Sequence, residues 1–263
     1  MKNPSEDCMP TFDAAQAAAR IAAAWTTGQC FVAAEHPAPP DVAAVYAVHR
    51  ALLPAIAPGQ RVDTWKISPR KPDAPPLAAP IPRRLASPAT LRGAPGRLLG
   101  IEAEIAYRFD RDLPPRPQRY VDAEVRAAVG TAHVAVEVCA TRFTDWSDAP
   151  ALWKLADLQS TACLVVSEGQ SNWRALDPVE LEAVVVVGDV ERMRRRNAHP
   201  NGDPASLLVD LVAHACAEGD GVRAGDIVTT GSWIGLLEVE LPARVEVRFD
   251  GVGVVRLALE AER

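Results

Sequence analysis

Two glutamates lie two residues apart in the apolar stretch between Leu99 and Tyr107. In an extended strand, the side chains of Glu102 and Glu104 would leave the same face, and the intervening apolar residues would occupy the other. Neighbouring carboxylates on a buried strand repel each other and lose solvation unless a positive charge lies close to both. A bound divalent cation would supply that charge, whereas a solvated sheet face would need none.

A third carboxylate lies in a second apolar segment, Thr131–Cys139. The valines of this segment would share one face of a strand, with Glu137 on the other face. Carboxylate oxygens and water are the ligands that Mg²⁺ and Mn²⁺ prefer, and no histidine or cysteine pattern suggests zinc instead. We therefore predict that Glu102, Glu104 and Glu137 bind one Mg²⁺ or Mn²⁺.

Lys66 is one of only four lysines in a chain whose basic residues are mostly arginine. It lies in the alternating segment Val62–Ile67, immediately before a proline-dense stretch. A scarce lysine inside a strand could serve a site, but a lysine at a strand end that extends its amine to water would look the same. The residues alone leave both interpretations open.

The elements that would position these side chains fall into two regions. Residues 1–60 predict an N-terminal helical cap, with one helix over 11–27 capped by Thr11 and ended by Gly28. A second helix would begin after Asp41, and Pro54, Pro58 and Gly59 would stop it. These helices offer too little core to fold alone.

Residues 61–263 predict the metal-binding catalytic domain, and strands dominate it. The proline-dense part, 69–88, excludes regular helix and central strand. A short run of arginines at 192–196 is typical of a solvated helix end or loop. The expected strands are 98–109, 131–139, 162–167, 181–187, 226–230, 244–249 and 254–259, and the expected helices are 122–129, 150–158 and 204–218. Strands without steady βαβ alternation predict the mixed α+β class with a mainly β core.

Five segments resemble, in order, motifs of the 2-keto-4-pentenoate hydratase group within the fumarylacetoacetate hydrolase superfamily. The resemblance extends from about Lys66 to Leu259 and implies a β roll or barrel-like core. The segments are Trp65–Lys66–Ile67, Gly100–Ile101–Glu102–Ala103–Glu104–Ile105–Ala106, Val136–Glu137–Val138 with Thr141–Arg142–Phe143, Leu155–Ala156–Asp157–Leu158–Gln159–Ser160, and Ala224–Gly225–Asp226–Ile227–Val228–Thr229–Thr230–Gly231.

The resemblance also implies roles for individual residues. Glu102, Glu104 and Glu137 would be the metal ligands, and Lys66 would be a catalytic lysine. Substrate would contact Ser160, Thr230, Gly231 and Ser232. Asp157 and Arg142 would hold these site residues in position without contacting the substrate. The aspartate of the group's P-D-[YF]-G motif has no match here, where Asp73 is the nearest candidate, and Leu158 replaces an asparagine.

The implied activity is a Mg-dependent hydratase that adds water to a 2-hydroxydienoate or 2-oxo-4-enoate through a metal-bound enolate. Related members decarboxylate 2-oxo-3-enedioates, tautomerise, or hydrolyse the C–C bond of acylpyruvates, and the missing aspartate weakens the case for hydration. A non-catalytic subunit that stabilises a related enzyme is a third alternative. An intact carboxylate triad argues against it.

The composition limits the kinds of partner that this protein could bind. A formal net charge of −6 without a concentrated basic surface argues against nucleic acid. No apolar run is long enough for a signal peptide or a membrane helix, and five scattered cysteines indicate no disulfide framework. We therefore expect a cytoplasmic homo-oligomer that acts on a small 2-oxo acid.

Overall fold

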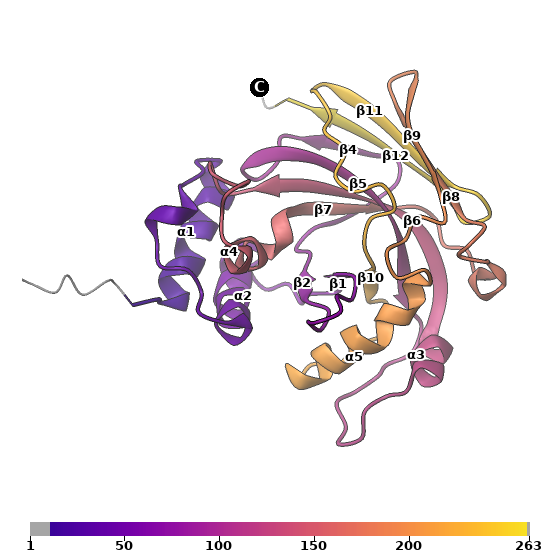
Figure 1. The fold of residues 1–263 in the computed structure, drawn as a ribbon, viewed down its shortest axis with the longest axis horizontal. Coiled ribbons are helices and arrows are strands. Elements are labelled where there is room, and N and C mark those ends of the chain that lie inside the picture. Colours follow the sequence, from indigo (N-terminus) through magenta and orange to yellow (C-terminus); the bar gives the residue numbers. More distant parts are fainter. Residues whose placement is uncertain (1–10, 262–263) are drawn as a thin grey trace, which may run out of the picture. The chain divides into compact units, whose positions relative to one another are not determined.

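The computed structural model describes residues 11–261, so residues 1–10 of the expected N-terminal cap and residues 262–263 lie outside it. The described chain divides into two compact units (Figure 1). The first unit combines the chain up to Gln60 with two later segments, Pro95–Arg97 and Thr141–Ser160. The second unit holds Arg61–Ala94, Leu98–Ala140 and the chain from Thr161 onward.

Two helices form most of the first unit. Helix α1 covers Ala14–Thr27, and its cap is Asp13 rather than Thr11, because the Asp13 carboxylate accepts bonds from the first exposed backbone N–H groups. Helix α2 covers Val42–Ile56 with Asp41 as its cap, as expected. It passes Pro54 and ends at Ile56, ahead of Pro58 and Gly59, and the buried stripe that includes Leu52 holds the last turn in place.

The remaining short elements of the first unit surround an aromatic centre. Phe31, Phe143 and Trp153 pack edge to face, with ring centroids 5.1 to 6.1 Å apart. Edge-to-face pairs add to the stabilisation that burial of the rings already gives. The elements are η1 (Ala33–Glu35), α4 (Ala151–Ala156) and η2 (Leu158–Ser160).

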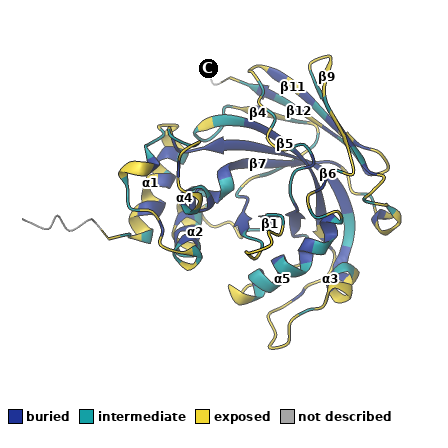
Figure 2. Ribbon diagram, viewed as in Figure 1, coloured by how far each residue is buried: buried dark blue, intermediate teal, exposed yellow. Residues whose placement is uncertain are grey.

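A seven-stranded sheet forms the centre of the second unit, in the order β2-β1-β10-β5-β6-β7-β3. The proline-dense stretch supplies both of its edge strands, β2 and β3, as the restriction of proline to sheet edges requires. The long strands β5 and β6 are almost continuously buried (Figure 2). The bounds are β1 Thr64–Ile67, β2 Ala78–Pro80, β3 Arg84–Ala86, β5 Arg97–Phe109, β6 Val129–Thr141, β7 Thr161–Val166 and β10 Ile227–Thr229.

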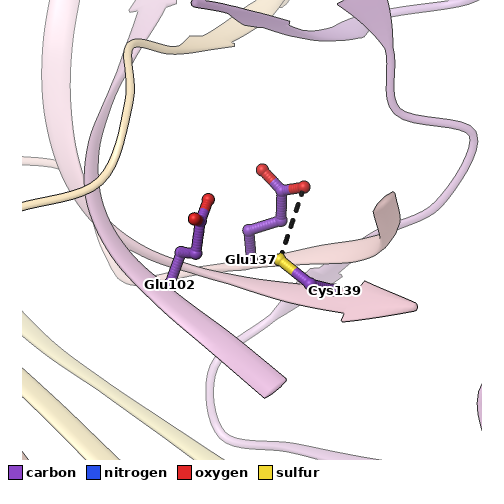
Figure 3. Close-up of side chains that lie close together, drawn as sticks. All are labelled: Glu102, Glu137 and Cys139. Carbon is purple, nitrogen blue, oxygen red and sulfur yellow. Dashed lines mark hydrogen bonds between the residues drawn. The ribbon is translucent and has the colours of Figure 1, made fainter. Parts of the chain in front are cut away.

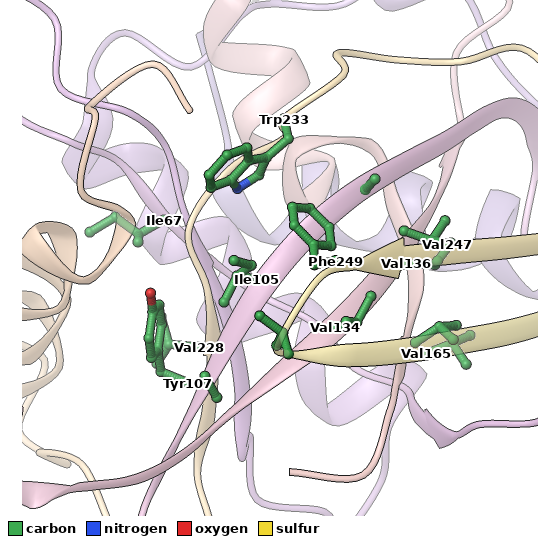
Figure 4. Close-up of a cluster of buried hydrophobic side chains, with 14 of the residues drawn as sticks. Ile67, Ile105, Tyr107, Val134, Val136, Val165, Val228, Trp233, Val247 and Phe249 are labelled. Atoms are coloured by element: carbon green, nitrogen blue, oxygen red, sulfur yellow. The ribbon is translucent and has the colours of Figure 1, made fainter. Parts of the chain in front are cut away.

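A second sheet of five strands, in the order β4-β12-β11-β8-β9, packs against one face of the first. Phe249 and Val247 from this sheet meet Ile105, Val134 and Val136 of the seven-stranded sheet in one core (Figure 4). The bounds are β4 Ala89–Arg92, β8 Glu182–Val187, β9 Val190–Arg196, β11 Ala243–Phe249 and β12 Gly253–Glu260. The expected mixed α+β class is therefore confirmed.

The arginine run was misassigned, because it forms β9 and not a helix end or loop. Val190 and Met193 are the only apolar residues of this strand and are three residues apart, so the sequence shows no alternation of apolar and polar residues. Arg194 is held by Glu182 and Glu191. The strand is therefore a charged sheet edge that resists pairing with another chain.

Helices of the second unit complete the same core. Buried residues of α5, including Leu211 and Val212, join the cluster that Tyr107 and Val228 contribute from the sheet. The helical elements are α3 (Asp122–Ala128), η3 (Trp173–Ala175), η4 (Pro204–Leu207) and α5 (Leu208–Ala217). Among the described residues, no helix combines the length and the apolar character that a membrane span requires.

Candidate metal centre

Strand register places Lys66 and the first two glutamates on one face of the seven-stranded sheet. Lys66 in β1 lies opposite Thr229 in β10, and Thr229 lies opposite Ala106 in β5. Ala106 alternates with Glu104 and Glu102 along β5, so all of these side chains share a face. The opposite face carries Ile101, Ala103, Ile105 and Tyr107 and belongs to the main core, as the alternation predicted.

Glu137 enters from the next strand. It lies opposite Leu164 of β7, and Ala135 lies opposite Val166. These apolar partners belong to a small separate cluster that also contains Ala106, on the face that carries the acids. The glutamates therefore lie beside apolar side chains rather than on a solvated sheet face.

Lys66 and Glu137 form a buried ion pair. The Lys66 Nζ donates to Glu137 Oε1 at 2.6 Å, and the side chains are 11% and 0% exposed. Burial alone would lower the pKa of Lys66, but attraction by Glu137 and Glu102 outweighs it and raises that pKa. Without a cation, Lys66 is therefore an ammonium held by the acids, whereas a cation beside it would push its pKa down.

Two donors hold one oxygen of Glu104. The Thr229 hydroxyl and the Gly231 backbone N–H, the latter at 3.0 Å, both donate to Glu104 Oε2. Gly231 has φ of +110°, and a Cβ there would lie 3.2 Å from Pro69, so glycine fits this turn best. Thr229 was not among the predicted site residues. Its position opposite Lys66 becomes evident only when the pairing of β1 with β10 is known.

Cys139 also lies in the site, which the sequence did not anticipate. Ligand atoms of Glu102, Glu137 and Cys139 all lie within 4.8 Å of one another (Figure 3). The Cys139 thiol donates to Glu137 Oε1 at 3.9 Å, and its pKa is raised by burial and by the neighbouring carboxylates. The signal that could have revealed it is simple, because residues 137 and 139 of a strand share a face.

The acids are poorly stabilised as carboxylates without a cation. Burial raises the pKa of Glu102 to about 7, even though Lys66 opposes the shift. Burial also raises the pKa values of Glu104 and Glu137. Glu137 Oε2 is buried without a hydrogen-bond partner of ordinary geometry among the described residues. The Thr161 hydroxyl is nevertheless close enough to the Glu137 carboxylate to lower its pKa. Glu102 and Glu137 belong to a group of ligand atoms within 4.8 Å of one another, and Glu104 lies outside that group. The carboxylate oxygens of the three acids are ligands of the kind that Mg²⁺ and Mn²⁺ prefer.

Thr229 should therefore orient Glu104 for metal binding. Replacing the hydroxyl in Thr229→Val leaves only the Gly231 N–H on Glu104 Oε2, so we expect Mg²⁺ affinity to fall by about 10- to 100-fold. Thr229→Ser keeps the hydroxyl and should retain most of the affinity. Isothermal titration of both variants with Mg²⁺ checks this, and equal affinities would show that the contact has no such role.

The other predicted substrate residues near β10 have local partners. The Thr230 hydroxyl donates to the Ile105 backbone carbonyl at 3.2 Å. The Ser232 hydroxyl donates to the Gly235 carbonyl at 3.1 Å and accepts from the Ile234 N–H at 3.3 Å. Of the predicted trio, the backbone of Gly231 is therefore the group with a direct bond to an acid of the site.

Candidate proton donors besides Lys66 are poorly placed for that task. His199 donates from Nε2 to the Thr230 carbonyl at 2.9 Å and accepts at Nδ1 from the Asn201 N–H at 3.2 Å. Both of its ring nitrogens are thus in use, and burial lowers its pKa. Asp73 is exposed in the turn between Lys71 and Ala74.

The remaining predicted residues belong to the first unit. The Ser160 hydroxyl accepts a bond from Trp146 Nε1 at 2.8 Å, and Ser160 ends a run of left-handed residues that includes Leu158. Asp157 and Arg142 form a fully buried ion pair. Asp157 also accepts bonds from the Thr141 hydroxyl and the Arg142 N–H, both at 3.1 Å, and the Arg142 guanidinium lies 4.8 Å from the centre of the Trp25 ring.

Asp157 should be a strong stabilising residue of the first unit. Asp157→Ala leaves the Arg142 guanidinium buried without its carboxylate, so we expect the free energy of unfolding to fall by about 3–5 kcal/mol. The exposed pair of Arg92 and Glu260 provides a control, and Glu260→Ala should cost less than about 1 kcal/mol. Denaturant titration of both variants measures the difference, and similar losses would contradict the assignment.

Comparison with known proteins gives sequence relatives over part of the chain. No family model matches. The chain is 31% identical over 157 residues to a 2-keto-4-pentenoate hydratase of Burkholderia vietnamiensis, which is 59% of this chain and 58% of that protein. A 2-keto-4-pentenoate hydratase of Paraburkholderia phymatum is 30% identical over the same shares. The match thus spans less than two thirds of these relatives.

Solved structures match the fold over most of the chain. The 4-oxalocrotonate decarboxylase from Pseudomonas putida G7, complexed with magnesium and adipate, superimposes with a TM-score of 0.82 at 18% identity. That match covers 95% of this chain and 99% of the other. Identity at this level shows that the two share a fold.

Proposed function

We propose that this chain is a member of the fumarylacetoacetate hydrolase superfamily and a Mg²⁺-dependent lyase of small unsaturated 2-oxo acids, with hydration as its reaction. The observation that carries the proposal is the group of three buried or half-buried acids and one lysine on a single sheet face, with Lys66 paired to Glu137 at 2.6 Å. The hydratase names of the sequence relatives support the choice of reaction.

Each residue has a distinct task in this proposal. Glu102, Glu104 and Glu137 would hold Mg²⁺ or Mn²⁺, and Thr229 and Gly231 would fix the orientation of Glu104. When bound, the ion would act as a Lewis acid toward the carboxylate and 2-oxo oxygens of the substrate. The neighbouring apolar cluster that contains Ala106 and Leu164 would limit access of bulk water.

Lys66 would handle the proton. Its Nζ would donate a proton to carbon 5, at the far end of the conjugated chain, while the 2-hydroxyl loses its proton to water, which converts a 2-hydroxydienoate into a 2-oxo-3-enoate. The remaining double bond is then electron-poor, so water adds its oxygen to carbon 4 and its proton to carbon 3. Glu137, which accepts from Nζ at 2.6 Å, would hold the amine in place between turnovers.

Decarboxylation is the second candidate, and one feature of the chain favours it. Asp73 is exposed and His199 has both ring nitrogens occupied, so neither of these two described residues is placed to act as a second proton carrier beside Lys66. Loss of CO₂ from a 2-oxo-3-enedioate requires fewer proton transfers than hydration does. The bond to the distal carboxylate breaks, its electron pair moves along the chain to the 2-oxygen, and that oxygen takes one proton.

Product analysis separates the two. The purified protein with Mg²⁺ should consume a 2-hydroxydienoate with loss of ultraviolet absorbance, give a hydroxylated 2-oxo acid by mass spectrometry, and stop on addition of EDTA. Release of CO₂ from a 2-oxo-3-enedioate, without turnover of the dienoate, would replace hydration by decarboxylation. Failure to act on a panel of such acids, with Mg²⁺ bound, would refute both.

A further inference from the structure

We propose that Cys139 gives this site a second metal chemistry, the capture of a thiophilic divalent ion such as Zn²⁺ or Co²⁺ by Glu102, Glu137 and Cys139. The inference rests on the proposed function only in that the same site would otherwise hold Mg²⁺. The three residues come from two neighbouring strands, and their ligand atoms lie within 4.8 Å of one another.

The oxygen that would complete the site is already present. Glu137 Oε1 accepts from Lys66 and from the Cys139 thiol, whereas Oε2 has no hydrogen-bond partner of ordinary geometry among the described residues. In Figure 3 the Glu137 oxygen that carries no dashed line lies on the side of Glu102. A buried carboxylate beside a second carboxylate and a thiol is a ligand set of mixed hard and soft donors.

The geometry suits such an ion after small side-chain movements. Zinc takes sulfur at about 2.3 Å and carboxylate oxygen at about 2.0–2.2 Å, in a tetrahedral arrangement that leaves a fourth position for water. Affinity for divalent ions of the first transition row exceeds that for Mg²⁺ at a site with sulfur, because Mg²⁺ strongly prefers oxygen. Zn²⁺ should therefore displace Mg²⁺ here and inhibit the enzyme.

Binding must release a proton from the thiol. The Sγ–H bond breaks, the Sγ–metal bond forms, and the proton leaves to solvent, so no oxidant or reductant is required. The site holds three glutamates against one lysine, and this negative charge favours replacement of the thiol proton by a divalent ion.

Cobalt is a direct probe, because a thiolate ligand to Co²⁺ gives a charge-transfer absorption in the near ultraviolet. The wild-type protein titrated with Co²⁺ in mildly alkaline buffer should develop this band and release one thiol proton per ion. Added Mg²⁺ in large excess should reduce the band. Cys139→Ser should lose it, with Zn²⁺ affinity reduced by at least about 100-fold.

Cys163 offers a matched control, since it is equally buried on the neighbouring strand but opposite Val138, on the main-core face. Cys163→Ser should keep the band, and Cys139→Ala serves if the serine variant does not fold by circular dichroism. Survival of the band in both Cys139 variants, or its absence from a wild type that Mg²⁺ stabilises against heat, would overturn this proposal alone. Failure of Mg²⁺ and Co²⁺ alike to stabilise the wild type would also overturn the proposed function.

Discussion

Glu104→Gln is expected to lower Mg²⁺-dependent turnover by on the order of 1,000-fold while leaving the metal-free protein at least as stable as the wild type. The first effect follows from loss of a charged ligand, because metal ions contribute several kcal/mol to stabilising charge in transition states. The second follows from burial. Glu104 is 1% exposed and its pKa is raised, so its charged form is disfavoured in the folded chain.

The sign of the pH effect follows from this shift. A glutamate whose pKa is raised in the folded state binds its proton more tightly there than in the unfolded chain. Low pH therefore increases the free energy of unfolding. The metal-free wild type should therefore lose stability as the pH rises above the ordinary pKa of glutamate and through the raised value. Glu104→Gln should show a smaller loss over the same range, because the amide does not ionise.

Thermal unfolding with and without Mg²⁺ measures both effects. The wild type should gain stability on addition of Mg²⁺, and Glu104→Gln should gain little. Glu240→Gln, at an exposed position, provides the control and should behave as the wild type does. A large loss of stability in metal-free Glu104→Gln would show instead that the carboxylate is a structural partner of Thr229 and Gly231.

The faces of single strands could be predicted from the sequence, because a strand has a fixed side-chain period of two. This period placed Glu102 and Glu104 together and put Ile101 and Ala103 in the main core, as the structure shows. It could also have indicated Cys139. Because its sequence neighbours are aliphatic, Cys139 resembles an ordinary core residue. The pattern of apolar residues alone does not distinguish a core cysteine from one in the site.

The order of strands across the sheet could not be predicted in the same way. Lys66 and Thr229 are far apart in sequence, and the parallel pairing of β1 with β10 makes them neighbours. A threonine hydroxyl in an apolar strand gives no local signal of a distant carboxylate partner. The family resemblance supplied Lys66, but the contact that orients Glu104 required the three-dimensional register.

Local rules also failed where tertiary packing overrides them. Pro54, the first of three residues expected to end the second helix, lies inside α2, which continues to Ile56 because Val48 and Leu52 are buried in the first unit. The arginine-rich strand β9 has no apolar face, and it is stabilised by pairing with β8 and by an ion pair between Arg194 and Glu182. In both cases, contacts distant in sequence decide the local conformation.

Lys66→Arg is expected to lose nearly as much turnover as Lys66→Met, at least about 100-fold, if the amine handles the proton. Arginine keeps a positive charge near Glu137, but its planar guanidinium does not give up a proton at ordinary pH and cannot reproduce a point contact at 2.6 Å. The loss should appear mainly in kcat, with KM changed less, because the interaction is made mainly in the transition state.

Metal affinity separates this catalytic role from a structural one. The ammonium of Lys66 lies beside the acids and repels a dication, so Lys66→Met should bind Mg²⁺ at least as tightly as the wild type while turning over poorly. A lysine that merely positions Glu137 would give the opposite result, with Mg²⁺ affinity and turnover falling together. Near-normal kcat in Lys66→Arg on a confirmed substrate would remove Lys66 from the chemistry and leave water held in the site as the proton carrier.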